Sequence, residues 1–258
     1  MKTIAIMNQK GGIGKTMTAT SIAYILGQQQ KKVLVVDADQ QGNASMIFGR
    51  YEPAGTGMAE LLEQHRLVGG RYGTSDLIKA TRYWNIDIIP ANGYLMRANM
   101  NLLATKGEDQ VVRFAAAMME VADVYDYCIV DCGLLMDMAV TNVLIGSDLV
   151  IVPVKVGGFE ISAIQNMEEQ LEDLRSLNEK IRMKILMTMR QKNQTSLQVE
   201  EWLKKSSGQD CFKTTIRRSI IAENSTIQQV PLPEFSKKCN VTKDYREVVN
   251  ELMEEMED

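Results

Sequence analysis

A glycine-rich loop lies between a short apolar run and a helical pattern, and it constrains the fold of this chain more than any other feature. The apolar run covers residues 3–7, the loop covers residues 10–16, and the helical pattern continues to about residue 28. Further short runs, apolar on both faces, alternate with helical patterns along the chain. Runs of this kind are typical of parallel strands that are covered by helices on both sides. We therefore predict an α/β fold with a doubly wound, mostly parallel sheet.

The predicted strands share their short length and their content of β-branched residues. They are residues 3–7, 33–36, 86–89, 127–130, 149–152, 183–187 and 212–216. The stretch 50–82 is less regular, and its glycines indicate a surface excursion. The helical pattern near the carboxyl end places Tyr245, Val248 and Leu252 on one face, which favours docking on the core. No repeat or low-complexity linker interrupts the chain, so a single domain over residues 1–258 is predicted.

The composition of the chain excludes several classes of protein. The sequence has 258 residues, 45% of them apolar and 24% charged, which is typical of a globular protein with a sizeable core. No apolar segment is long enough to cross a membrane, and the patch at residues 3–7 is too short for a signal-peptide core. We expect a cytoplasmic protein with four reduced cysteines. His65 is the single histidine, and we expect it at the surface.

The loop resembles a phosphate-binding loop. Such loops follow the pattern G-x-x-x-x-G-K-[ST], and Gly14, Lys15 and Thr16 match its end, whereas Gln9 stands at the first glycine position. Successive backbone N–H groups and the start of a helix can surround phosphate oxygens, Lys15 can reach them, and Thr16 can offer its hydroxyl to Mg²⁺. The predicted nucleotide-binding residues are Lys10, Gly11, Gly12, Ile13, Gly14, Lys15, Thr16 and Met17.

Three aspartates stand where two predicted strands end. Asp37 and Asp39 close the second run, and Asp131 follows the apolar residues 128–130. Open α/β sheets bind ligands at the carboxyl ends of their strands. The sequence therefore predicts an Mg²⁺ site formed by Thr16, Asp37 and Asp131. No N-K-x-D motif for reading guanine is present, which favours ATP over GTP.

A second lysine, Lys10, precedes Lys15 by five residues, which is the signature of the deviant Walker A class. On this motif the chain resembles the ParA/MinD family, especially the short Soj-like partition ATPases. The resemblance spans nearly the whole chain. It includes KGGIGKT at 10–16, VLVVDADQQGNAS at 33–45, YDYCIVDCG at 125–133, SDLVIVPVK at 147–155, FKTTIRRS at 212–219, VPLPEF at 230–235 and KDYREVVNEL at 243–252.

The resemblance implies roles for individual residues. Lys10 would cross into the partner subunit of an ATP-sandwich homodimer and contact the nucleotide there. Asp39 would position the attacking water, so the implied catalytic residues are Lys10, Lys15 and Asp39. The adenine base would lie between Met189 and Pro231.

The resemblance also implies non-specific DNA binding through the last third of the chain. The total net charge is −4, but residues 182–240 contain 11 basic and 5 acidic side chains. Non-specific binding depends on clustered contacts to phosphates and not on the total charge. The matching positions are Arg190, Arg217 and Arg218. The alternative is a set of solvated surface charges.

Taken together, the expected function is that of an Mg-ATP-dependent partition ATPase. ATP would join two subunits, the dimer would bind DNA on the nucleoid, and slow hydrolysis, stimulated by a ParB-like partner protein, would release it. No membrane partner is expected, because the carboxyl-terminal helix ends in acidic residues. The alternatives are a MinD-like ATPase that positions a protein cargo and, from another class, a biosynthetic or metal-inserting relative.

The chain departs from the family pattern at four places. Met17 replaces a threonine, Gln40 replaces the proline after Asp39, Gly133 with Leu134 replaces a proline pair, and Gln229 replaces the glycine of a G-x-P pattern. None of these changes removes a predicted catalytic group. They indicate a divergent member, with effects on hydrolysis and on partner choice.

Overall fold

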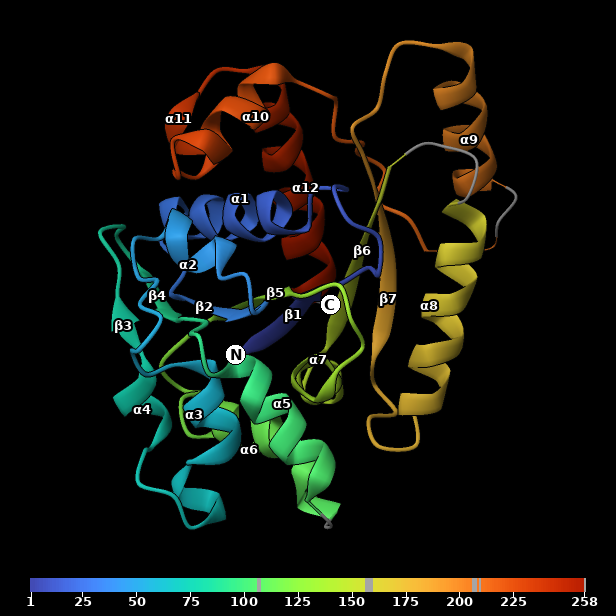
Figure 1. Cartoon of the computed structure of the whole chain (residues 1–258). Helices are drawn as coiled ribbons and strands as arrows, with labels where there is room; N and C mark the ends of the chain where they lie inside the picture. Colours follow the sequence, from blue (N-terminus) through green and yellow to red (C-terminus); the bar gives the residue numbers. More distant parts are fainter. Residues whose placement is uncertain (106–107, 156–159, 206–207, 209, 258) are drawn as a thin grey trace.

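A seven-stranded sheet forms the centre of the molecule (Figure 1). The computed structural model describes residues 1–105, 108–155, 160–205, 208 and 210–257. The strand order is β3-β4-β2-β5-β1-β6-β7, and every pairing is parallel except β3 with β4. This confirms the predicted doubly wound α/β sheet. The strands are β1 (Lys2–Ile6), β2 (Val33–Ala38), β3 (Lys79–Ala80), β4 (Ile86–Ile89), β5 (Tyr127–Cys132), β6 (Leu149–Lys155) and β7 (Arg182–Thr188).

Helices cover both faces of the sheet. Figure 1 shows α1, α10, α11 and α12 on one face and α3, α5, α6 and α7 on the other. Successive residues of a strand point to opposite faces, so Ile4 and Ile6 join one apolar core while Ala5 and Met7 join the other. The helices are α1 (Lys15–Gln28), α2 (Asn43–Ile47), α3 (Met58–Glu63), α4 (Thr74–Leu77), α5 (Leu95–Ala104), α6 (Arg113–Met119), α7 (Met138–Ile145), α8 (Glu160–Leu174), α9 (Gln194–Lys205), α10 (Ile220–Ile227), α11 (Leu232–Phe235) and α12 (Asn240–Glu257).

The carboxyl-terminal helix α12 docks on the core, as predicted. Tyr245, Val248 and Leu252 are at most 1% exposed and belong to the same apolar core as α1. The hydroxyl groups of Tyr245 and Thr18 lie 3.1 Å apart, which adds a buried polar contact between the two helices. No helix in the described part of the chain has both the length and the apolar character that a bilayer crossing requires.

The prediction of a strand at 212–216 is wrong. The Phe212 and Ile216 amides donate to the Ile185 and Met187 carbonyls of β7 at 3.0 and 2.8 Å, and isolated bridges flank the segment at Cys211 and Arg217, but no continuous ladder forms. The amides of Lys213 and Thr214 donate instead to the Glu251 carboxylate of α12, at 2.7 and 2.8 Å. A side chain on a distant helix thus replaces the strand partner that these amides would otherwise need.

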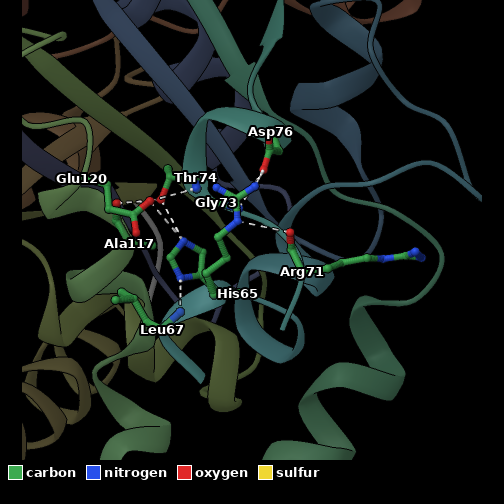
Figure 2. Close-up of polar contacts among 9 residues, drawn as sticks. His65, Leu67, Arg71, Gly73, Thr74, Asp76, Ala117 and Glu120 are labelled. Atoms are coloured by element: carbon green, nitrogen blue, oxygen red, sulfur yellow. Dashed lines mark hydrogen bonds and ion pairs between the residues drawn. The ribbon is translucent and has the colours of Figure 1, made fainter. Parts of the chain in front are cut away.

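The excursion at 50–82 contains α3, α4, β3 and a buried histidine. His65 is 1% exposed, so its predicted surface position is wrong. Its Nδ1 accepts a hydrogen bond from the Leu67 amide at 3.3 Å, and its Nε2 lies 3.0 Å from the Thr74 hydroxyl and 3.4 Å from the Glu120 carboxylate (Figure 2). The Thr74 hydroxyl itself donates to the Ala117 carbonyl. His65 therefore ties the excursion to α6 and has a structural role.

Candidate nucleotide site and basic groove

A cavity of about 400 Å³ lies where the loop after β1 meets the end of β7 and helix α10. The predicted loop residues from Gly11 to Met17 line one side of it, together with Asp39. Residues 216–219 and α10 line the opposite side. The carboxyl ends of parallel strands thus open into the cavity, which is the usual place for a ligand in such sheets.

The backbone of the loop requires glycine at two positions. Gly12 has a φ of 67° and Gly14 a φ of 93°, values that other residues adopt only with strain. Gly14 is also the N-cap of α1, so the first N–H groups of a 14-residue helix lie at the cavity. Unpaired N–H groups at a helix start, with the positive end of the helix dipole, favour a bound phosphate.

Lys15 begins α1 and is 8% exposed. Its Nζ donates to the Lys10 carbonyl at 3.1 Å, across the base of the loop. Burial lowers the pKa of Lys15, while the charges of Asp131 and Asp39 raise it. Lys10 is half-buried beside the loop, its amide is bonded to the Asn8 side chain at 3.0 Å, and it is not among the described residues that line the cavity.

Asp131 is fully buried behind the loop. Within the part of the chain that the structure describes, neither of its carboxylate oxygens has a hydrogen-bond partner. Burial and then the charge of Asp37 raise its pKa well above the usual range, and the nearby Thr16 hydroxyl and Lys15 lower it. A buried carboxylate without a partner is costly, and a cation beside it would remove that cost.

The donor set fits Mg²⁺. This ion takes oxygen ligands, keeps several waters, and is usually held by one or two carboxylates and the phosphates of a substrate. Thr16 and Asp131 offer a hydroxyl and a carboxylate of this kind. Among the described residues, no three His, Cys, Asp or Glu side chains gather at one point as a site made wholly of protein ligands would require.

Asp37, which is predicted at the metal site, is hydrogen-bonded through both carboxylate oxygens. Its Oδ2 accepts from both the amide and the hydroxyl of Ser45 at 2.7 Å, and its Oδ1 accepts from the Asp39 amide at 3.2 Å. Burial, the largest effect, raises its pKa to about 6, and the Ser45 hydrogen bonds oppose that rise. Because both oxygens are engaged, Asp37 holds the loop from Asp39 to Ser45 in place.

Asp39 itself faces the cavity. Its Oδ1 accepts from the Gln41 amide at 3.0 Å, which closes a turn after β2. Gly133 lies opposite, where an added Cβ would stand 3.7 Å from that oxygen. Leu134, in the position of a family proline, also lines the cavity and is 45% exposed. The loop after β5 thus brings an apolar side chain to the opening beside Asp39.

Of the two residues predicted to contact adenine, one lines the cavity and the other does not. Met189 lines the cavity with a φ of 53°, and its Cε lies 3.9 Å from the point where a Cβ of Gly14 would be. A non-glycine residue in this conformation costs about 1–3 kcal/mol and is typical of functional sites. Pro231 does not line the cavity. It is buried and caps α11 with a φ of −56°, which suits the start of a helix.

Helix α10 occupies the side of the cavity that was predicted for Pro231. Ala222, Glu223 and Thr226 line the cavity, and Tyr245 of α12 joins them. The sequence offered one signal for this helix, Ser219, whose side chain accepts from the Ile221 amide as an N-cap. No local pattern indicates that this helix faces the cavity, because that depends on how the chain folds back over α1.

A second hollow adjoins the cavity and carries the predicted DNA-binding residues. It measures about 790 Å³, and none of the described residues that line it is acidic. We call it the basic groove. Its basic residues come from three segments of the chain and are Arg190, Lys192, Arg217, Arg218 and Lys238. Arg217, Arg218, Ser219 and Val241 line both the groove and the cavity.

Each arginine of the basic groove has an acidic partner just outside it. Arg190 Nε lies 2.7 Å from Glu200, and Arg218 lies 3.8 Å from Glu223. Arg217 binds Asp244 through its guanidinium, with an Nε to Oδ2 distance of 2.9 Å, and through its own amide at 3.0 Å. Arg217 therefore also holds its segment to α12, so its removal would disturb the structure as well as the charge.

Three other basic residues of 182–240 pair with acidic side chains and do not line the groove. Arg182 and Lys184 both pair with Glu255 of α12, at 3.1 and 2.7 Å, and Lys205 pairs with Glu201 within α9. The excess of positive charge in this segment is thus partly neutralised by α12, and the basic groove contains only part of it.

Comparison with known proteins identifies the family. A family model described as an AAA domain matches residues 1–185. The sporulation initiation inhibitor protein Soj of Bacillus subtilis is 31% identical to this chain, over 97% of this chain and 98% of Soj. The chain belongs to the ParA/MinD superfamily. The chromosome partitioning protein ParA of Caulobacter vibrioides is 26% identical, over 98% of this chain and 94% of its own length.

A solved structure shows how widely this superfamily fold is used. The cobyrinic acid a,c-diamide synthase of Mycobacterium smegmatis, crystallised with an ATP analog and magnesium, superposes on this chain with a TM-score of 0.83. It is 22% identical, over 100% of this chain and 96% of the synthase. At this identity the likeness shows the fold alone, and the activity must be argued from the site.

Proposed function

We propose that this chain is an Mg-ATP-dependent partition ATPase of the Soj and ParA type. One observation carries the proposal: the cavity behind the phosphate loop and the basic groove share a wall, formed by residues 217–219 and Val241. A ligand in the cavity therefore contacts the same segment as a polyanion in the groove. The full-length similarity to Soj and to a chromosome partitioning protein supports this function over that of the synthase, whose identity to this chain is lower.

The chain's own groups can perform the nucleotide chemistry. The N–H groups of Gly11 to Thr16 would hold the phosphates, and Lys15 would turn from the Lys10 carbonyl to the phosphate oxygens. Mg²⁺ would be held by Thr16 and, through water, by Asp131, and when bound it neutralises charge on those oxygens. Asp39, at the opening, would orient the attacking water. Met189 and α10 would contact the nucleoside.

Two subunits would be joined by ATP. Lys10 lies outside the cavity of its own subunit, which agrees with a role at the nucleotide of a second subunit. The dimer would place two basic grooves on DNA and hold it without sequence preference. Hydrolysis, stimulated by a ParB-like partner, would release the DNA. Such a protein would work in the cytoplasm, on the nucleoid.

Light scattering with and without ATP and Mg²⁺ tests the nucleotide-dependent dimer. We expect a transient dimer for the wild type, a lasting dimer for Asp39→Ala, and a monomer for Lys10→Ala. Lys32→Ala, which removes an exposed lysine away from the loop, serves as the matched control and should behave as wild type. Dimerisation of Lys10→Ala at wild-type ATP concentrations would remove the role of Lys10 in the second subunit.

Retention of a DNA duplex of mixed sequence tests the second half of the proposal. We expect ATP-dependent binding that is weakened in Arg218→Ala and in Lys238→Ala. Lys205→Ala removes one positive charge outside the groove and should retain wild-type binding. A chain that forms no dimer with ATP and binds no DNA would instead favour a biosynthetic ATPase of the same fold.

A further inference from the structure

Three consecutive residues at the end of β7 connect the phosphate loop with the basic groove. Thr188 is 1% exposed, and its hydroxyl donates to the Ile13 carbonyl of the loop at 2.8 Å. A loop that points its N–H groups at a phosphate turns carbonyls away from the cavity, and a buried carbonyl needs a donor. Thr188 is the donor for Ile13, so the shape of the loop and the end of β7 are held together.

The next two residues continue the connection into the groove. Met189 follows with its left-handed backbone and reaches the loop at Gly14. The Arg190 amide donates to the Ile216 carbonyl at 2.9 Å, and the Arg190 carbonyl accepts from the Arg218 amide at 3.0 Å. The backbone of residues 188–190 is thus fixed to the phosphate loop at one end and to residues 216–218, beside the groove, at the other.

We propose that Thr188 is a positioning residue that transmits the state of the phosphate loop to Arg190 and Arg218. The inference rests on the proposed function, because it assigns nucleotide to the cavity and DNA to the groove. When phosphates occupy the loop, a shift of the Ile13 carbonyl moves Thr188. The backbone rotates at Met189, the residue in the left-handed conformation. Arg190 then changes its position relative to Glu200, and Arg218 changes its position relative to Glu223.

The test removes the hydroxyl and keeps the shape. Thr188→Val leaves the Ile13 carbonyl without its donor, whereas Thr188→Ser retains the donor. We expect the ratio of DNA affinities with and without ATP and Mg²⁺ to fall at least tenfold in Thr188→Val and to return toward wild type in Thr188→Ser. Ser147→Ala is the control. The Ser147 hydroxyl donates a similar buried hydrogen bond of 2.7 Å to the Val143 carbonyl, and neither residue lines the cavity, so its removal should leave the ratio unchanged.

A second measurement separates this inference from the proposed function. Hydrogen exchange of the Arg190 and Arg218 amides needs no DNA, and we expect ATP with Mg²⁺ to change it in the wild type but not in Thr188→Val. If ATP binds and changes the exchange but DNA is not retained, the proposed DNA-binding function is contradicted, whereas the coupling through Thr188 is supported. If ATP binds without a change in exchange, or if Thr188→Val keeps the wild-type ratio, the connection is overturned.

Discussion

At the scale of single residues, two buried carboxylates stand side by side at the ends of β2 and β5. Asp37 and Asp131 are direct partners in the parallel register of β2 and β5. Burial raises the pKa of both groups, and each also feels a neighbouring carboxylate. Only Asp37 has hydrogen-bond donors for its oxygens, through Ser45 and the Asp39 amide. The unfavourable position of Asp131 is what a bound cation would relieve.

Replacement of Asp131 by asparagine should stabilise the ligand-free protein while it weakens binding of ATP with Mg²⁺. An amide removes the buried charge and keeps the shape, so we expect about 1–3 kcal/mol of added stability, or roughly 2–4 °C in Tm for each kcal/mol. Thermal unfolding without nucleotide measures this. Asp123→Asn, at an exposed position, is the control and should change Tm little.

The same carboxylates should make stability depend on pH. The folded-state pKa of Asp37 is raised from 3.8 to about 6, so the folded chain binds this proton more tightly than the unfolded chain. The contribution to stability is therefore present below pH 3.8 and is lost as the pH rises to about 6. Asp131 extends the loss upward, because its pKa is also raised. Unfolding of wild type and Asp131→Asn across this range should show a shallower decline in the variant, and equal slopes would contradict the assignment.

At the scale of elements, the segment 211–218 shows how a helix can prevent a segment from joining the sheet as a further strand. Glu251 of α12 accepts from the amides of Lys213 and Thr214, one at each carboxylate oxygen. Arg217 is held to the same helix by Asp244. This segment is thus attached to α12 at two points, to β7 at Ile185 and Met187, and to Arg190 just beyond the end of β7. This attachment places Arg217 and Arg218 between the cavity and the groove.

Glu251→Gln should therefore destabilise the segment more than an ordinary surface substitution. The amide offers one acceptor oxygen for two donors and removes the charge, so we expect a loss of about 1–2 kcal/mol in the free energy of unfolding. Urea unfolding measures the loss. Glu254→Gln, on the exposed face of the same helix, should cost much less, and equal losses in the two variants would show that the capping contact contributes nothing.

The elements were predictable to different degrees. Six of the predicted runs are strands, because short β-branched runs that are apolar on both faces have few alternatives inside an α/β core. Residues 212–216 have a similar pattern, but the amides of Lys213 and Thr214 bond to the Glu251 side chain, 37–38 positions away, and not to a neighbouring strand. The placement of His65 depends in the same way on Glu120 and on Ala117 of α6, which no local pattern reveals.

At the scale of the whole molecule, the −4 net charge and the basic groove coexist because charge is segregated. Among the described residues that line the groove, five are basic and none is acidic. Acidic residues outside the groove pair with Arg190 and Arg217. Glu255 of α12 pairs with Arg182 and Lys184. DNA binding should therefore depend on the groove alone, present twice in a dimer.

The salt dependence of DNA affinity tests whether the basic groove is the DNA-binding surface. Each phosphate contact contributes about −0.9 to the slope of log affinity against log salt concentration. Because a dimer has two grooves, Arg218→Ala should lower the magnitude of the slope by about 2. Lys205→Ala, outside the groove, should leave the slope at its wild-type value. A slope that is unchanged in Arg218→Ala would place the DNA on another surface.

The sequence by itself determined the parallel sheet, the phosphate loop and the strand-end aspartates, because periodicity and glycine spacing act between neighbouring residues. Only the tertiary structure decided which carboxylate is unpaired, which arginines meet in one groove, and that α10 and not Pro231 lines the cavity. These properties arise from contacts between distant segments. The environment of a side chain, and with it its charge and its partners, is set only when those segments pack together.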